Sequence, residues 1–286
     1  EYIDAVSFFE DNPPRPIEEN RSDLLNAFGE LLLWEDGCCS RELRTRVGRQ
    51  EMLYGAQRTV SPLDWANTRR TFHGYKGMYQ GHGWNVVGFY TNTIDPDTSH
   101  FDRINDDEEF MGVYATTSDC CGRTVDLFYL RLLDQMDQGP FPNDFDFHTI
   151  GGRMKGKHGC YDYEFWGAYQ FGQNTDNSDH AAGAFTLGVG RTFECHCWKP
   201  AVWIYYDWAS GDDDQGAGNG YHHLFPLAHK YLGFMDLFGR RNIESPNLLF
   251  TMQPHEKLKL LLWYHYFRLQ NGNDTPYSVV MTPFNP

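Results

Sequence analysis

The connections between the apolar-rich segments of this chain alternate between short and long. Short turns are expected at residues 36–40, 81–83, 119–122, 157–160, 195–198 and 253–256. Long loops are expected between them, at residues 51–67, 95–107, 135–144, 173–181, 210–242 and 271–276. When antiparallel strands follow one another in sequence, every second connection lies at the same end of the sheet. The pattern therefore predicts an up-and-down antiparallel sheet with its short turns at one end, which is the layout of an outer-membrane β-barrel.

The segments between these connections have the two-residue period of β-strands. In residues 201–208, Val202, Ile204 and Tyr206 share one face, whereas Trp203 and Tyr205 share the other. Several segments approach the ~9–11 residues that a tilted membrane strand needs. Strands are expected at residues 22–35, 39–50, 68–80, 84–94, 108–118, 123–134, 145–157, 160–172, 182–194, 199–209, 243–253 and 257–270, and a further one is expected to begin within 277–284.

The composition fits a sheet with one apolar and one polar face. Aromatic residues make up 16% of the chain, yet its mean hydropathy is −0.59. No apolar run approaches the roughly 18 residues of a membrane helix. We therefore expect a single transmembrane barrel domain over residues 1–286, with an extended segment at 1–21. The alternative, a soluble all-β protein, gives no reason for the sorting of the loops by length. The net charge of −15 argues against nucleic acid as a partner.

Cysteines gather in or beside the short turns. They are Cys38, Cys39, Cys120, Cys121, Cys160, Cys195 and Cys197. In a barrel all of them would lie on the periplasmic rim, where disulfides or a docking surface for a partner are possible roles. The alternative is that cysteines occur in these turns only because small residues suit tight turns, and that nothing binds at this rim. Because the Cys195-His196-Cys197 spacing is too tight for one tetrahedral metal site, we expect neither a metal nor a cofactor.

Basic residues follow the same alternation. A cation that faces lipid at mid-bilayer costs about 2–4 kcal/mol, so basic side chains on strands are expected to face the barrel interior. The basic residues expected to face the barrel interior for this reason are Arg44, Arg46, Arg70, Lys76, Arg131, Arg153 and Lys155. Arg49 has the opposite parity and is expected to turn inward at the start of loop 51–67. That loop, with Arg58 and the adjacent Arg69, is expected to fold into the lumen as a constriction.

Several separated motifs resemble those of the alginate export family of outer-membrane porins. The longest, at residues 46–76, reads RVGRQEMLYGAQRTVSPLDWANTRRTFHGYK. The others are DLFYLRL at 126–132, GAFTLGVGRTF at 183–193, WIYYDWASGD at 203–212 and HLFPLAHKYLGFMDLFGRRNI at 223–243. One departure is His73, which stands where the family has Asp.

The resemblance implies an outer-membrane barrel of about eighteen strands whose lumen carries an anionic, alginate-like polysaccharide. Fewer strands are visible here, so we expect the closing strands to be absent from this sequence or supplied by a partner chain. Carboxylates of the polysaccharide would meet guanidinium groups along the lumen. The alternative is that these arginines only pair with interior carboxylates such as Glu30, Glu164 and Asp207 and neutralise a water-filled interior. The expected substrate-binding residues are Arg44, Arg46, Arg49, Arg58, Arg69, Arg70, Arg131, Arg153, Lys155, Tyr205, Arg240 and Arg241.

Two other functions compete with the channel. The barrel could be a structural or assembly unit of an outer-membrane complex, docked or cross-linked to neighbouring barrels or to a periplasmic protein through its cysteine-rich rim. It could also be a polysaccharide-cleaving enzyme that uses Asp162 and Glu164. Alternation produces such carboxylate pairs routinely, however, and no loop supplies an acid–base set, so we expect no enzymatic activity.

Overall fold

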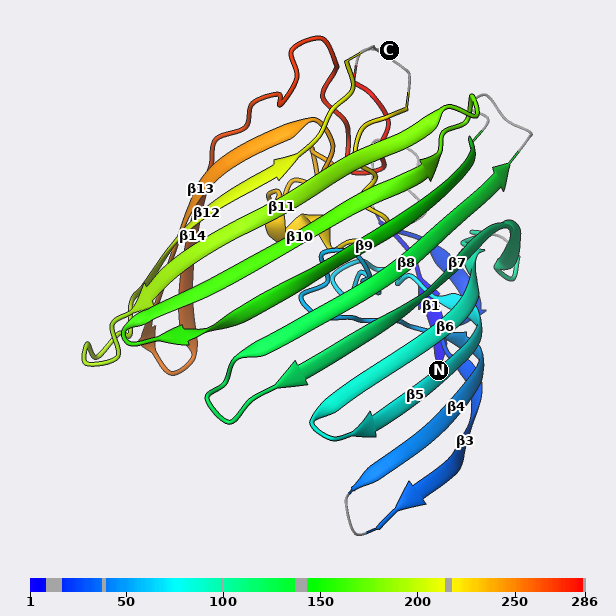
Figure 1. Ribbon diagram of the computed structural model, residues 1–286, viewed down its shortest axis with the longest axis horizontal. Helices are drawn as coiled ribbons and strands as arrows, with labels where there is room; N and C mark the ends of the chain where they lie inside the picture. The colour runs from blue at the N-terminus through cyan, green and yellow to red at the C-terminus, as the bar shows by residue number, and fades with distance from the viewer. Residues whose placement is uncertain (9–16, 38–39, 99, 137–142, 214–217, 285–286) are drawn as a thin grey trace. The chain divides into compact units, whose positions relative to one another are not determined.

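The computed structural model describes residues 1–8, 17–37, 40–98, 100–136, 143–213 and 218–284. Within these ranges the chain forms a twelve-stranded sheet, a two-stranded sheet and one short helix, α1 (Ala228–Tyr231) (Figure 1). None of the helical structure in the described part of the chain could traverse a lipid bilayer.

The strands match most of the segments expected from the alternation. Their bounds are β1 (Tyr2–Ala5), β2 (Asn20–Leu24), β3 (Ala27–Asp36), β4 (Arg41–Gln50), β5 (Phe72–Gly81), β6 (Trp84–Asp95), β7 (Arg103–Ser118), β8 (Thr124–Met136), β9 (Asn143–His158), β10 (Tyr161–Gln173), β11 (Asp179–Thr192), β12 (Ala201–Ala209), β13 (Ile243–His255) and β14 (Leu258–His265). Strands β3 to β14 hydrogen-bond to one another in sequence order, and the pairing is antiparallel. The predicted up-and-down antiparallel sheet is confirmed.

The register of β11 to β14 aligns side chains across four strands. Tyr205 of β12 lies opposite Gly188 of β11 and opposite Asn247 of β13. Asn247 in turn lies opposite His265 of β14. Because directly opposed residues of antiparallel strands project to the same side of the sheet, these four positions share one face.

Some strand boundaries differ from the expectation. The segment expected at 22–35 is divided, because β2 pairs with β1 in the two-stranded sheet whereas β3 pairs with β4. The predicted strand within 277–284 is wrong: only an isolated bridge between Tyr277 and Pro283 forms there. Prolines at 276 and 283 lack the backbone N–H that a ladder requires. The predicted loop 210–242 also contains α1.

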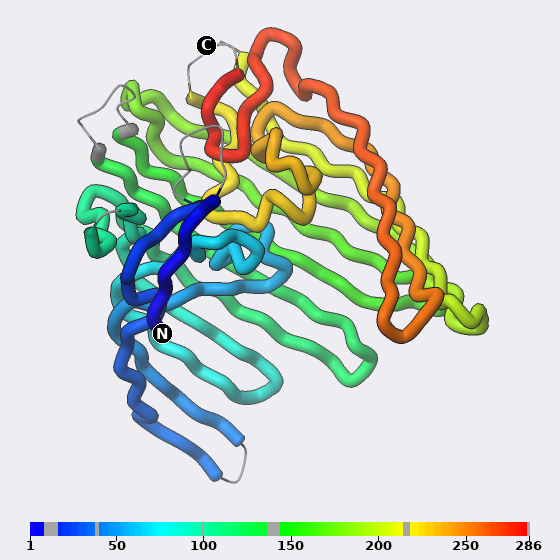
Figure 2. The backbone as a smooth tube through the Cα atoms, turned by 180° about the vertical axis from the view of Figure 1, so that it is seen from behind, coloured from blue at the N-terminus to red at the C-terminus, as the bar shows by residue number. Residues whose placement is uncertain are grey.

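The described chain divides into two compact units, and the single transmembrane barrel domain over residues 1–286 stays a prediction. Unit 1 comprises Glu1–Ala115, Tyr129–Asp146 and Leu224–Leu227. In it, segment 51–71 folds back over the strands, which can be followed in light blue in Figure 2. Val60 pairs with Phe225 in a parallel bridge, and the Phe225 ring lies 4.9 Å from that of Phe110. The core of unit 1 is therefore a layer of loop side chains on one face of its sheet.

Unit 2 comprises Thr116–Phe128, Phe147–His223 and Ala228–Pro286. Its loop residues also pack on one face of its own strands. Tyr221 is fully buried and its ring meets Trp166 of β10 edge to face. The amide of Gln170 donates to the His222 carbonyl at 2.7 Å and accepts from the His222 N–H at 2.8 Å. In each unit we call this the covered face, and the opposite side the open face.

Candidate functional site

The two faces of the sheet have opposite chemistry to those of a water-soluble protein. On β10, the open face presents Tyr161, Phe165 and Tyr169, with exposed fractions of 55%, 36% and 50%. The covered face holds Glu164 at 7% and Gln170 at 0%. Soluble proteins rarely expose contiguous large apolar side chains while they bury polar ones. In unit 2 the open face is thus apolar and the covered face polar.

Unit 1 repeats this arrangement. Tyr75 and Tyr90 lie on the open faces of β5 and β6 and are 62% and 44% exposed. Their neighbours Lys76 and Thr91, on the covered face, are 8% and 0% exposed. The same division therefore recurs in strands of both units, and it follows from the two-residue period of the sequence.

Arg44 and Arg46 lie on the covered face of β4, as the alternation predicts. Arg46 Nε lies 2.8 Å from a Glu30 carboxylate oxygen, and Arg44 Nη2 lies 2.9 Å from Glu42. Glu30 also accepts a hydrogen bond from Arg44, at 3.4 Å. Lys76 lies directly opposite Arg46 in the register. The predicted cluster of cations is therefore present on this face, and of the two carboxylates that neutralise it Glu30 was expected and Glu42 was not.

Arg49 also turns toward neighbouring loops rather than outward. Its Nη1 lies 3.0 Å from Asp23 and 2.6 Å from the Leu24 carbonyl oxygen. Its Nη2 donates to the Asp102 carbonyl at 3.2 Å. These contacts tie the end of β4 to β2 and to the loop before β7.

The arginines of loop 51–71 are built into the core of unit 1. Arg58 is only 3% exposed. Arg69 forms an ion pair with Glu51 at 2.9 Å. Arg70 donates to the Ser61 carbonyl at 3.3 Å, and its guanidinium lies 5.2 Å from the centre of the Phe225 ring. Burial lowers the pKa of Arg70 to about 10, so this guanidinium stays charged at neutral pH.

On the covered face of unit 2, two arginines sit in ion pairs. Arg153 of β9 bridges Asp126 of β8 and Glu164 of β10, at 2.8 and 3.0 Å. Arg240 lies 2.8 Å from Asp207, and both are almost fully buried. Lys155 shares the parity of Arg153 but lies nearer the turn and is exposed.

The structure places Arg131 on the opposite face from the one predicted. Its β8 neighbours Leu130 and Leu132 are almost fully buried, whereas Tyr129, which shares the parity of Arg131, is 39% exposed. Arg131 is paired with both oxygens of Asp146, each at 2.7 Å. A carboxylate partner lowers the free-energy cost of placing a cation on an apolar face. The alternation of residues along one strand does not reveal such a partner, because Asp146 lies on the neighbouring strand.

Arg241 and several aromatic residues surround a cavity of about 180 Å³ in unit 2. The Arg241 guanidinium lies 4.3 Å from the centre of the Tyr277 ring. Phe238 and Phe267 form another wall, with ring centroids 4.8 Å apart. The sequence named Arg241 but not these aromatic residues, because they come from three separate segments.

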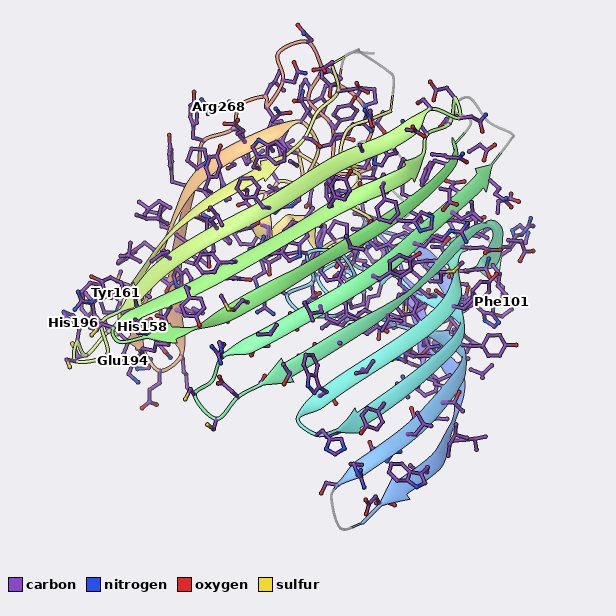
Figure 3. All side chains as sticks on the ribbon, in the orientation of Figure 1. Phe101, His158, Tyr161, Glu194, His196 and Arg268 are labelled. Atoms are coloured by element: carbon purple, nitrogen blue, oxygen red, sulfur yellow. The ribbon has the colours of Figure 1, made fainter. Side chains whose placement is uncertain are left out.

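The cysteines that the structure describes lie in turns at one end of the strands of unit 2. They are Cys120, Cys121, Cys160, Cys195 and Cys197, and all are exposed free thiols. Figure 3 shows His158 and Tyr161 of one turn close to Glu194 and His196 of the next. Cys38 and Cys39 lie outside the described residues. The common location fits the predicted rim, while disulfide pairing stays a prediction. Within the described residues no group of His, Cys, Asp and Glu has a metal-binding arrangement.

Comparison with known proteins gives one family. The family model described as alginate export matches residues 1–285, which is essentially the whole chain. No curated protein matches this chain.

Proposed function

Because the chain belongs to the alginate export family, a family of outer-membrane transport channels, we propose that it forms an outer-membrane channel for anionic oligo- or polysaccharide. The antiparallel up-and-down sheet agrees with the barrels of that family. The observation that carries the proposal is the chemistry of the two faces. An apolar open face suits contact with lipid, and a covered face with charged and hydrogen-bonding groups suits a water-filled interior.

The arginines of the covered face supply the sites for the anionic substrate. Arg44 and Arg46 keep 37% and 24% of their side-chain surface exposed, so a substrate carboxylate can reach them. Each already has a carboxylate partner, Glu42 or Glu30, which the substrate replaces during passage. Exchange between partners of similar strength gives several moderate sites in series, and moderate sites release a moving chain.

The loop arginines have a different role in this proposal. Arg58 is buried and Arg70 is half-buried, and Arg70 is held between the Ser61 carbonyl and the Phe225 ring. They give segment 51–71 a fixed shape and a positive charge where it lies over the strands of unit 1. We propose that this segment narrows the passage and that Arg69, paired with Glu51 at the edge of the core, contacts substrate there.

A second function is supported by the exposed thiols of unit 2. Five free cysteines in three turns at one end of the strands form a surface that could fasten a neighbouring barrel or a periplasmic protein. This assembly role does not exclude transport. Non-reducing electrophoresis of protein extracted from membranes tests it, because monomers with all thiols free would contradict covalent assembly.

Conductance in planar lipid bilayers tests the channel proposal. The wild-type protein is expected to be anion-selective and to be blocked by alginate oligomers. Arg44→Gln and Arg46→Gln are expected to weaken both properties. The control is Arg123→Gln, which changes a 56% exposed turn residue paired with Asp119. Cation selectivity of the wild type, or equal effects of the three variants, would contradict the proposal.

A further inference from the structure

Five ring-bearing side chains form a continuous series on the covered face of unit 2. Trp203 and Tyr205 of β12 stack with ring centroids 5.3 Å apart and planes inclined by 6°. Tyr205 lies 6.2 Å from Trp263 of β14. Trp263 is followed by His265 at 5.1 Å, and His265 by Phe267 at 5.3 Å. We call these five rings the aromatic ladder.

Two glycines of β11 set how the first rings lie. A Cβ atom at Gly190 would stand 2.3 Å from Cδ2 of Trp203, and one at Gly188 would stand 2.3 Å from Cε1 of Tyr205. The rings therefore rest directly on the backbone of the neighbouring strand, which only glycine permits at this distance. Each of the five residues of the ladder is half-buried. The ladder is thus an accessible surface and not a closed core.

The ladder ends at the cavity of about 180 Å³. Phe267 lines this cavity together with Phe238 and Tyr277. Arg241, whose guanidinium lies over the Tyr277 ring, adds a buried Nε that has no hydrogen-bond partner within the described part of the chain. The cavity therefore combines apolar ring walls with an unused donor.

Polar groups beside the ladder are neutral or already paired. Trp263 Nε1 donates to Asn247 at 2.8 Å, and Asn247 donates to Asp207 at 3.0 Å. Asp207 is also paired with Arg240. Both ring nitrogens of His265 are buried without a hydrogen-bond partner in the described residues. Of these described groups beside the ladder, the two charged ones, Asp207 and Arg240, are therefore paired with each other.

We infer that the aromatic ladder is a stacking track for a chain of pyranose units and that the cavity binds one terminal unit of that chain. The inference rests on the proposed function and specifies how the substrate is held. The C–H bonds on the face of a pyranose ring carry partial positive charge and meet the negative face of an aromatic ring. Recognition along this track depends on the shape of the sugar face and not on its charge.

Block of the channel current by oligosaccharides tests the inference. The full chain is reconstituted in planar bilayers in about 1 M KCl, where the screening length is about 3 Å. A neutral β-linked oligosaccharide and an oligouronate of equal length are the probes. Both are expected to block the wild type, and Trp263→Leu is expected to weaken the block about tenfold. The matched control is Tyr264→Leu, since Tyr264 is the next residue of β14 and lies 64% exposed on the open face.

A second variant keeps every ring of the ladder. Gly190→Ala forces the Trp203 ring off the β11 backbone and is expected to weaken the block while heat-modifiable migration shows a folded protein. Equal block in the Trp263 and Tyr264 variants, or a wild-type block that disappears in high salt, overturns the ladder but leaves the channel proposal standing. A wild-type protein that conducts no ions, or that no saccharide blocks at any salt concentration, overturns both.

Discussion

Replacing Arg153 with methionine is expected to destabilise the protein by about 3–5 kcal/mol. Arg153 lies between Asp126 and Glu164, and the three side chains are 11%, 0% and 9% exposed. Methionine fills a similar volume but leaves two buried carboxylates facing each other without a cation. Water does not reach them well enough to restore the lost interaction, so the penalty exceeds the roughly 0–1 kcal/mol of an exposed ion pair.

The free energy of unfolding in lipid vesicles, followed by tryptophan fluorescence during urea titration, measures this loss. Arg123→Met is the matched control, because Arg123 pairs with Asp119 at 3.0 Å but is 56% exposed. It is expected to cost less than about 1 kcal/mol. Adding Asp126→Asn and Glu164→Gln to Arg153→Met removes the unpaired charges and is expected to restore most of the stability. If Arg153→Met behaves like the control, or if the neutral triple variant is no better, the three residues do not form a coupled buried unit.

Three further outcomes follow from the structure. Burial lowers the pKa of His222 to about 3, from 6.5 in the unfolded chain. Between these two pH values only the unfolded state binds a proton at this imidazole. The free energy of unfolding is therefore expected to fall by about 1.4 kcal/mol per pH unit as the pH drops from about 6.5 to 5. His222→Asn should lack this share of the slope in the same urea titration, and an unchanged slope would contradict the burial of the imidazole. Ile204→Lys places a cation on the open face of β12, at a residue 65% exposed, and is expected to cost about 2–4 kcal/mol in a bilayer; insertion equal to that of Ile204→Leu would show that this face does not meet lipid. A membrane-impermeant maleimide should label Cys120 and Cys160 in the folded, reduced protein, whereas protection of both would contradict their exposure.

The strands could be predicted from the sequence because the alternation of apolar and polar residues is visible within each strand by itself. The alternation of apolar and polar residues in 201–208 or 161–171 needs no knowledge of the neighbouring strand. It also placed Arg44 and Arg46 correctly on the covered face. The strand prediction fails where apolar and polar residues no longer alternate. In residues 277–284, Pro276 and Pro283 prevent a hydrogen-bonded ladder from forming.

Which arginine pairs with which carboxylate could not be predicted in the same way. Arg153 meets Asp126 across 27 positions of the chain, and that contact depends on the register of β8 against β9. Arg131 shows the same limit from the other side, because its pairing with Asp146 allows a cation to lie on the open face. The sequence placed Trp203 and Tyr205 on one face of residues 201–208, but the aromatic ladder as a whole was missed, because its rings come from β12 and from the region of β14. Only the register between those strands brings them into line.

Ion pairing and ring stacking favour the same kind of transport. The chain has a net charge of −15, and in the structure Arg46, Arg153 and Arg240 each have a carboxylate within 3.0 Å. In the proposed channel a polyanion would reach these three guanidinium groups only by displacing acids that are already in place, so the net gain in binding free energy at each of them would be small. Stacking on a single ring is also weak, at about 0.5–1.5 kcal/mol beyond the area buried. A chain held by many weak contacts of both kinds can advance by one unit without first breaking a strong one, and this is the condition for conduction through a selective pore.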